Sequence, residues 1–199
     1  MIAILDYGMG NLRNVQKALE FIGQKAYITE EPAGLARAER LILPGVGAFR
    51  QASQRLRQTG LGAAFAAAVQ QGRPALGICL GMQLLFEESD EFGVHQGLGL
   101  IPGRITRIRS GGQKIPHMGW NAIAARGESP LLAGLDGSYF YFVHSLCMQQ
   151  ADADCVTGVC NYGEDFGALV RLGNLHGAQF HPEKSGDAGL ELLRHFAAI

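Results

Sequence analysis

The sequence has few of the features that mark secreted, zinc-binding or membrane proteins. Its 199 residues include only four cysteines, with no Cys-x-x-Cys pair and no close Cys/His spacing of the kind that zinc sites need. No segment approaches 18 consecutive apolar residues, and the first residues are strand-like rather than basic and then apolar. We therefore expect a cytoplasmic protein, and we expect no metal ion and no cofactor.

Charge of one sign is also not concentrated anywhere in the chain. The formal net charge is −1, and lysine and arginine are scattered, so no basic surface for nucleic acid or anionic lipid is predicted. A hydrophobic fraction of 47% with 18% charged residues is ordinary for a globular protein, and the length allows one substantial core. Residues 1–199 are expected to form a single domain.

Glycine, in contrast, is abundant, and segments with strand-like and helix-like apolar patterns alternate through the first 90 residues. The 28 glycines imply many tight turns between strands and helices. Helical spacing of apolar residues follows a first strand and recurs near residues 56–69, with an interruption near Gly60. A further helix is predicted over Leu80–Glu88. The strands predicted in this half are Ile2–Leu5, Ala26–Thr29, Arg40–Leu43 and Pro74–Ile78. This alternation predicts an α/β fold whose parallel sheet is covered by helices on both faces.

The second half reads as successive strands with short polar or glycine-containing connections, which favours antiparallel pairing. It closes with a helix predicted over Ala188–Ala198. The predicted strands are Ile105–Ile108, Trp120–Ala124, Tyr139–His144, Val156–Asn161, Ala168–Leu172 and Leu175–Phe180.

One cysteine occupies a position typical of a nucleophile. Cys79 lies between a predicted buried strand and a predicted helix, with Gly77 and Gly81 on either side. Nucleophile elbows have this arrangement, because the turn is too sharp for a Cβ atom at the flanking positions. The amino end of a helix also favours the thiolate, which is the attacking form.

A thiolate needs a base and an oxyanion hole, and the sequence offers candidates for both. Among six histidines His181 stands out, because it follows an apolar strand and precedes Pro182 and Glu183, whose carboxylate could fix the ring's tautomer. For the oxyanion we predict the N–H group of Leu80 and the N–H groups of Val46 and Gly47 in the segment Pro44-Gly45-Val46-Gly47, although this segment alone reads equally well as a tight turn.

Together, Gly77-Ile-Cys-Leu-Gly-Met-Gln83 and His181-Pro-Glu183 resemble the signature of the class I glutamine amidotransferases, over almost the whole chain. The resemblance implies a flavodoxin-like sheet and a glutaminase in which Cys79 forms a glutamyl thioester. It also implies that His181 moves the protons and that Gly45, Gly47 and Gln83 hold the substrate. Alone, Gln83 would be read as a solvated helix residue.

Within this family, four segments resemble the branch that passes ammonia through a channel to a separate cyclase with a β/α-barrel fold. The resemblance implies a heterodimer, and it implies that the peptide at Val46 reorients when the partner binds. Residues placed at the interface are Asn11, Asn14, Trp120 and Lys184, though a buried core position is nearly as probable for the indole. The four segments are Asp6–Asn11, Leu43–Phe49, Ile115–Asn121 and His181–Ser185.

Two positions depart from the pattern of that branch, and three other readings stay open. Leu146 stands where tyrosine is usual and Cys160 where threonine is usual. The first departure suits another amidotransferase glutaminase, such as the anthranilate synthase component. A stand-alone cysteine peptidase or amidase would share the elbow. An interaction subunit without activity is disfavoured, because all three candidate catalytic residues are present.

Overall fold

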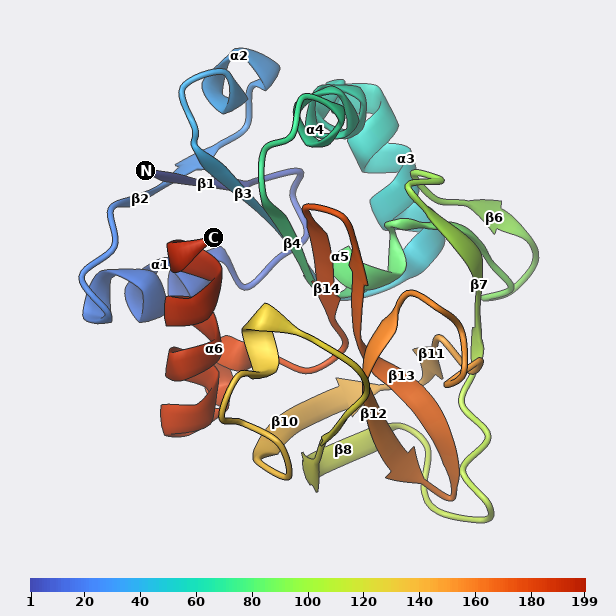
Figure 1. The fold of residues 1–199 in the computed structure, drawn as a ribbon. Helices are drawn as coiled ribbons and strands as arrows, with labels where there is room; N and C mark the ends of the chain where they lie inside the picture. The colour runs from blue at the N-terminus through green and yellow to red at the C-terminus, as the bar shows by residue number, and fades with distance from the viewer.

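The computed structural model describes residues 1–199 and has an eight-stranded mixed sheet at its centre (Figure 1). The strand order is β2-β1-β3-β4-β14-β13-β12-β9, in which the first five strands are parallel and the last three antiparallel. The predicted α/β architecture is confirmed, and the parallel part has the flavodoxin-like order. The strands are β1 (Ile2–Leu5), β2 (Ala26–Thr29), β3 (Arg40–Gly45), β4 (Ala75–Cys79), β9 (Ala124–Ala125), β12 (Val156–Tyr162), β13 (Glu164–Leu172) and β14 (Leu175–Ala178).

Helices cover both faces of the parallel strands, as the alternation of the sequence predicts. Side chains of β1 alternate between two apolar cores: Ile2 and Ile4 pack under α1 and α6, whereas Ala3 and Leu5 pack under α3 and α4. Figure 1 shows these two helix pairs on opposite sides of the sheet. The helices are α1 (Leu12–Phe21), α2 (Pro32–Leu35), α3 (Phe49–Thr59), α4 (Leu61–Gln70), α5 (Leu80–Gln83) and α6 (Gly186–Ala198), with short 3-10 turns at Pro130–Leu132 and Pro182–Lys184.

The predicted break between α3 and α4 is present at Gly60. This residue has φ 73° and ends α3, while the next residue begins α4. A positive φ of this size favours glycine, since other residues clash with their own Cβ there.

Two small sheets complete the fold beside the antiparallel end of the main sheet. One is the antiparallel pair β8–β10, in which Trp120 lies opposite Tyr141 and His117 opposite His144. The other has the order β11-β7-β5-β6. Their strands are β5 (Phe86–Ser89), β6 (His95–Gln96), β7 (Ile101–Arg107), β8 (His117–Ala122), β10 (Tyr139–His144) and β11 (Leu146–Cys147).

The helix predicted over Leu80–Glu88 is wrong beyond its first turn. Only α5 is helical, and Phe86 begins strand β5. The carbonyl groups of Leu84 and Leu85 accept hydrogen bonds from residues 98–101 instead of from the next helical turn. Every residue from Leu80 to Phe86 is buried, so the segment has no polar face to turn toward water. None of the helices combines the length and the apolar character that crossing a membrane requires.

Candidate active site

The turn at Cys79 joins β4 to α5 and forces the cysteine into a strained conformation. Cys79 has φ 55° and ψ −111°, one of only two non-glycine residues with positive φ. A Cβ on Gly77 would lie 2.7 Å from the carbonyl oxygen of Gly81, and a Cβ on Gly81 would lie 1.8 Å from that of Leu43. Both contacts are with backbone, so neither can be relieved by a side-chain rotation. The glycines therefore allow the turn, and the strain of about 1–3 kcal/mol is of the kind that gathers at functional sites.

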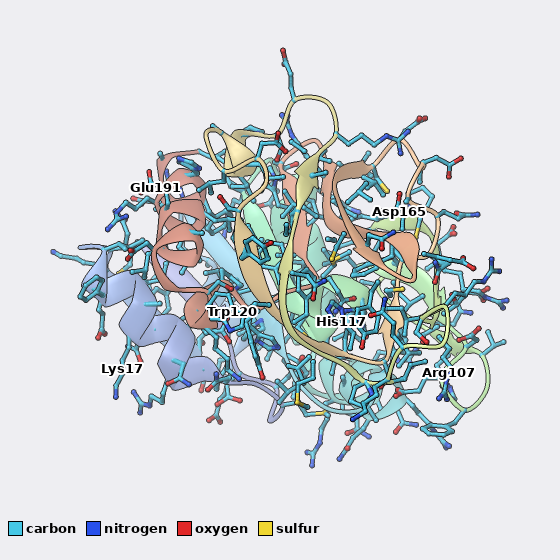
Figure 2. All side chains as sticks on the ribbon, turned by 90° about the horizontal axis from the view of Figure 1, so that it is seen from below. Lys17, Arg107, His117, Trp120, Asp165 and Glu191 are labelled. Carbon is cyan, nitrogen blue, oxygen red and sulfur yellow. The ribbon has the colours of Figure 1, made fainter.

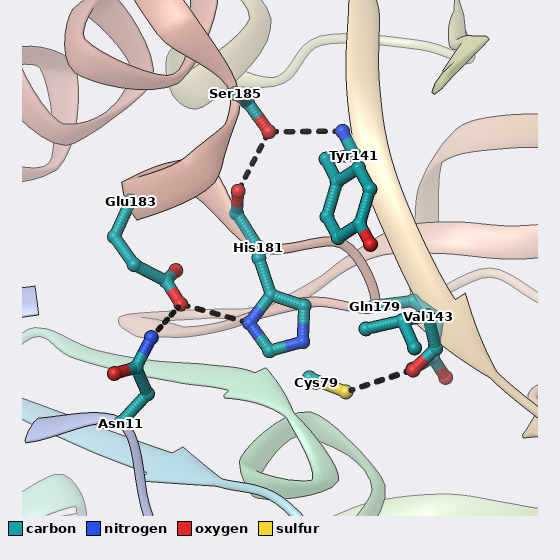
Figure 3. Close-up of polar contacts among 8 residues, drawn as sticks. All are labelled: Asn11, Cys79, Tyr141, Val143, Gln179, His181, Glu183 and Ser185. Carbon is teal, nitrogen blue, oxygen red and sulfur yellow. Dashed lines mark hydrogen bonds and ion pairs between the residues drawn. The ribbon is translucent and has the colours of Figure 1, made fainter. Parts of the chain in front are cut away.

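His181 and Glu183 lie directly beside this turn, in the loop after β14. The Nδ1 atom of His181 is 2.8 Å from Oε1 of Glu183, and both side chains are almost fully buried. Figure 3 shows the imidazole ring between this carboxylate and Cys79. The Nε2 atom of His181 is buried and makes no hydrogen bond. A buried nitrogen without a partner, on the side of a thiol, is available to exchange a proton with a substrate.

The position of the imidazole is fixed through its backbone. Ser185 donates its hydroxyl proton to the carbonyl oxygen of His181 at 2.6 Å and accepts the N–H of Tyr141 at 3.0 Å (Figure 3). The N–H of His181 donates to the carbonyl of Tyr141 at 2.9 Å. The histidine is thus held between β10 and the start of α6.

Electrostatics favour the protonated form of His181. Burial alone lowers the pKa of an imidazole, but the neighbouring Cys79, the hydrogen bond to Glu183 and the charge of that carboxylate outweigh it and raise the pKa of His181. An imidazolium beside sulfur stabilises a thiolate and has a proton to give to a leaving group.

The loop after β3 faces the cysteine from the other side, because β3 is also a neighbour of β4. Gly45 lies opposite Cys79 in the register of these strands, and Gly47 has φ 102°. A Cβ on Gly45 would meet the hydroxyl of Tyr7 at 2.5 Å, and that hydroxyl donates to the carbonyl of Pro44 at 2.8 Å. Tyr7 thereby fixes the loop that contains the predicted oxyanion donors.

A cavity of about 310 Å³ opens above the sulfur, at the lower end of the range that small-ligand sites occupy. The predicted residues Val46, Gly47, Leu80 and Gln83 line it together with Cys79 and His181. Gly45 and Glu183 are not among the residues that line it. The remaining lining residues are Glu91, Pro116, Val143, His144, Ser145 and Leu146.

Gln83 is 4% exposed, so the alternative of a solvated helix residue is excluded. Its amide nitrogen donates to the carbonyl of Leu146 at 2.9 Å and to Oε1 of Gln179 at 3.1 Å. Gln179 in turn directs its own amide nitrogen at the sulfur of Cys79, 3.8 Å away. Because α5 is a single turn, it contributes free N–H groups rather than the substantial dipole that the longer predicted helix would have supplied.

Three of the four predicted interface residues lie around the loop that carries His181 and Glu183 and the neighbouring Tyr141, and one stands apart. The amide nitrogen of Asn11 is 3.4 Å from Oε1 of Glu183, and the ammonium of Lys184 lies 5.9 Å from the centre of the Tyr141 ring. Trp120 packs edge-on to that ring and is 52% exposed, which excludes the core position. Asn14 is exposed further along α1.

Four residues that contact this site are not among the site residues that the sequence predicts, and they come from different parts of the chain. Tyr7, Gln179 and Ser185 lie inside or beside recognisable motifs, which draw attention to these residues. The motifs do not indicate which contacts the three side chains make. The fourth, Glu91, lines the cavity and accepts the N–H of Phe49 at 2.6 Å. It follows β5, where the sequence predicted the end of a helix. No three His, Cys, Asp or Glu side chains lie close enough together to hold a metal ion.

Comparison with known proteins agrees with this geometry. The family model for class-I glutamine amidotransferases matches residues 3–198, so the chain belongs to that family. Among solved structures, a glutamine amidotransferase superposes with a TM-score of 0.77 at 20% identity over 98% of both chains. PurLQS from Thermotoga maritima gives a TM-score of 0.78, also at 20% identity, over 99% of this chain and 97% of its own. At this level of identity the structures establish the fold alone.

More similar relatives narrow the family to one kind of subunit. A protein from Syntrophotalea carbinolica is 49% identical over 98% of both chains, and one from a Geobacillus species is 48% identical over 100% of this chain and 97% of its own. A relative from Geobacter sulfurreducens is 46% identical over 100% of this chain. All three bear the name imidazole glycerol phosphate synthase subunit HisH.

The first prediction concerns the steric demand of the turn. Gly81→Ala should lower the free energy of unfolding by about 3 kcal/mol, the upper range for overpacking a rigid site. Gly173→Ala, which has φ 60° but open space around it, should lose only about 1 kcal/mol from backbone strain. Denaturant unfolding of the two variants checks this. Equal losses would show that the turn has room for a methyl group.

The second prediction concerns the charge state of His181. Glu183→Gln keeps an acceptor for Nδ1 but removes the negative charge, so the pKa of His181 should fall by about one or more, the usual effect of a neighbouring opposite charge. The imidazole then loses its proton at a lower pH than in the wild type. An NMR titration of the ring measures this, with Glu191→Gln on the surface of α6 as control. An unchanged titration of His181 in Glu183→Gln would contradict the assigned cause.

Proposed function

We propose that this protein hydrolyses glutamine to glutamate and ammonia through a thioester on Cys79, with residues 1–199 acting as one glutaminase domain. The observation that carries the proposal is the strained cysteine at the floor of a cavity, with the buried pair His181–Glu183 at its side. Family membership supplies the reaction class. Cys79, His181 and Glu183 are the proposed catalytic residues.

In the first half of the reaction the sulfur of Cys79 attacks the carboxamide carbon of glutamine. The negative charge that forms on the carboxamide oxygen is proposed to be bound by the N–H of Leu80 and by the loop at Val46 and Gly47; one such donor contributes roughly 10²–10³ in rate. His181 gives its proton to the leaving nitrogen. The C–N bond breaks, ammonia departs and the glutamyl thioester remains.

In the second half, water replaces ammonia as the nucleophile. His181, now neutral, takes a proton from the water as its oxygen attacks the thioester carbon. Collapse of this intermediate breaks the C–S bond, and glutamate and the original cysteine are restored. Glu183 holds the Nδ1 proton throughout, which keeps Nε2 as the atom that exchanges protons.

The cavity offers groups for both ends of the substrate. Gln83 and the backbone of Gly45 and Gly47 are proposed to hold glutamine close to Cys79. Glu91 contributes a carboxylate to the lining, and the only hydrogen bond it accepts there comes from a backbone N–H. A carboxylate in that place suits the ammonium group of an α-amino acid.

The ammonia is proposed to go to a partner, the cyclase subunit of imidazole glycerol phosphate synthase, a β/α barrel that forms a heterodimer with this chain. In the active site of that partner, ammonia reacts with the ribulosyl formimino aminoimidazole carboxamide nucleotide. The products are imidazole glycerol phosphate and aminoimidazole carboxamide ribotide, and the pathway is cytoplasmic histidine biosynthesis. The full-length relatives named as HisH subunits support this assignment. A protected passage is needed because ammonia is protonated in water.

The proposed docking surface lies on the outer face of β8 and β10. Trp120 and Met118 are 52% and 62% exposed there, and Tyr141 lies between Trp120 and Lys184. An exposed indole beside an aromatic ring is the type of residue that anchors protein interfaces. The same face continues to Val143, which pairs with Met118 and lines the cavity. A partner on this face would therefore stand next to the place where ammonia is released. Asn11 and Asn14 would extend the contact along α1.

The rival glutaminase, an anthranilate synthase component, has one residue in its favour. Leu146 suits it, but this side chain stands in the cavity wall and not among the proposed catalytic residues. Identity of 46–49% to subunits named HisH, over nearly the full chain, favours the first assignment.

The third prediction tests glutaminase activity and its dependence on the partner. Glutamate release from glutamine should be slow with this chain alone and should rise strongly when the cyclase subunit and its nucleotide ligand are added, because the peptide at Val46 must reorient to complete the oxyanion hole. Cys79→Ala serves as the blank.

The same assay tests the proposed docking surface. Trp120→Ala should need a higher concentration of the cyclase subunit for half-maximal stimulation. Equal turnover with and without partner would refute the coupling, and no glutamate under any condition would refute the glutaminase.

The fourth prediction tests the role of Glu91. Glu91→Gln should raise KM for glutamine about tenfold or more, the effect of losing a charge-assisted hydrogen bond, with little change in kcat. Binding of glutaramate, which lacks the amino group, should be equal in both proteins. Glu88→Gln, whose carboxylate pairs with Arg104 on the surface, is the matched control. An equal loss of affinity for glutaramate would show that Glu91 acts on the shape of the cavity instead.

A further inference from the structure

Two buried histidines, of which one lines the cavity, take no part in the proposed chemistry. His117 on β8 and His144 on β10 are opposite each other in the register of the pair and are 0% and 6% exposed. The ring of His117 is stacked between Tyr162, at a centroid distance of 4.0 Å, and Phe142, at 4.8 Å. Burying two imidazoles is unfavourable unless their nitrogens are hydrogen-bonded.

The hydrogen bonds of these rings run in one direction, which a carbonyl group determines. The carbonyl of Leu146 can only accept, so the Nδ1 atom of His144, 2.9 Å away, carries the proton. Burial lowers the pKa of His144 to about 3, so its Nε2 atom keeps a lone pair. This lone pair accepts from Nδ1 of His117 at 3.0 Å. Both rings are therefore fixed as tautomers with the proton on Nδ1.

On the side away from Cys79, this chain of hydrogen bonds ends in the middle of β8. The Nε2 atom of His117 contacts the side-chain amide of Asn121, with 2.8 Å to its oxygen. Burial lowers the pKa of His117, while its contact with Asn121 acts in the opposite direction. With the proton of His117 on Nδ1, its Nε2 is an acceptor, so the Asn121 amide satisfies it only with its NH₂ group turned toward the ring and away from the carbonyl of Asn161, 3.4 Å from the amide nitrogen. Asn121 adjoins Trp120, and Figure 2 shows His117 and Trp120 along the same side of the molecule.

At its other end, the chain of hydrogen bonds leads to Cys79. The carbonyl of Leu146 accepts a second hydrogen bond, from the amide nitrogen of Gln83 at 2.9 Å. The same nitrogen contacts Gln179, whose amide points at the sulfur of Cys79. One carbonyl thus joins the histidine pair to the two glutamines that lie beside the sulfur.

We propose that His117 is a positioning residue for the reaction: through His144 and the carbonyl of Leu146 it sets the orientation of Gln83 and Gln179 and thereby the place of the Cys79 sulfur. This role rests on the proposed glutaminase function but is carried by different residues. It makes β8 the strand that connects the outer face bearing Trp120 to the nucleophile. His117 touches neither the cavity nor the sulfur, so it acts only through its neighbours.

The test uses alkylation of Cys79 by iodoacetamide, which requires neither glutamine turnover nor a partner. His117→Phe keeps a stacked ring but removes the donor, and Cys79 should be labelled roughly three- to tenfold more slowly, the effect of losing one hydrogen bond. His117→Asn places an amide N–H where Nδ1 was and should restore the rate. His176→Phe replaces another fully buried histidine, at the opposite end of β14, and should leave labelling unchanged. Mass spectrometry of the labelled peptide separates Cys79 from the other three cysteines.

A second measurement on the unmodified protein covers the case in which His117→Phe does not fold. Long-range ¹H–¹⁵N NMR spectra assign the tautomer of each ring, and both His117 and His144 should carry their proton on Nδ1. Labelling rates of Cys79 that are equal in His117→Phe and the wild type would overturn the proposal, and so would a proton on Nε2 of His144. A failure of glutamate release alone, with these two results as expected, would remove the proposed function and leave the positioning of the sulfur in place.

Discussion

The arrangement of the site depends on the turn at Cys79. Two glycines without side chains let β4 pass into α5 against the backbone of Leu43, and the strained φ of 55° then directs the sulfur out of the sheet. Strain of this kind persists only where packing on every side prevents relaxation. Here β4 lies between β3 and β14, with a helix pair on each face, so the core holds the cysteine in a conformation that it would not adopt alone.

The strand order then places the other groups. Because β3 and β14 are the two neighbours of β4 and run parallel to it, the loops that leave their carboxyl ends must lie on either side of Cys79. One loop carries Gly45 and Gly47, and the other carries His181 and Glu183. Residues more than 100 positions apart are thus brought together by register alone. The loop after β1 completes the group, since Tyr7 contacts the first loop and Asn11 the second.

Features that depend on contacts between residues close in the sequence could be predicted, and features that depend on long-range contacts could not. The elbow, the strand ends and the pair His181–Glu183 are defined within a few residues, so local patterns reveal them. The helix over Leu80–Glu88 was overpredicted because the carbonyls of Leu84 and Leu85 are taken by a segment some 14 residues further on. Glu91 escaped prediction for the same reason: its partner, the N–H of Phe49, is 42 residues away, and no local pattern encodes that distance.

The two sides of the cavity differ in how their strands are paired. The side of the cavity that carries Cys79 and His181 belongs to the central sheet, where β4 is paired on both edges. The opposite wall is formed by Pro116 and residues 143–146, at the end of β10, and β10 pairs only with β8. The β8–β10 pair carries exposed apolar residues outside and the histidine pair inside. Its hydrogen bonds meet the side of Cys79 and His181 at two places, the carbonyl of Leu146 and the backbone of Tyr141. A two-stranded sheet is marginal in isolation, so its geometry depends on what packs against it. A subunit bound to the outer face would add such packing, and the resulting change would reach the site through these two contacts rather than through the central sheet.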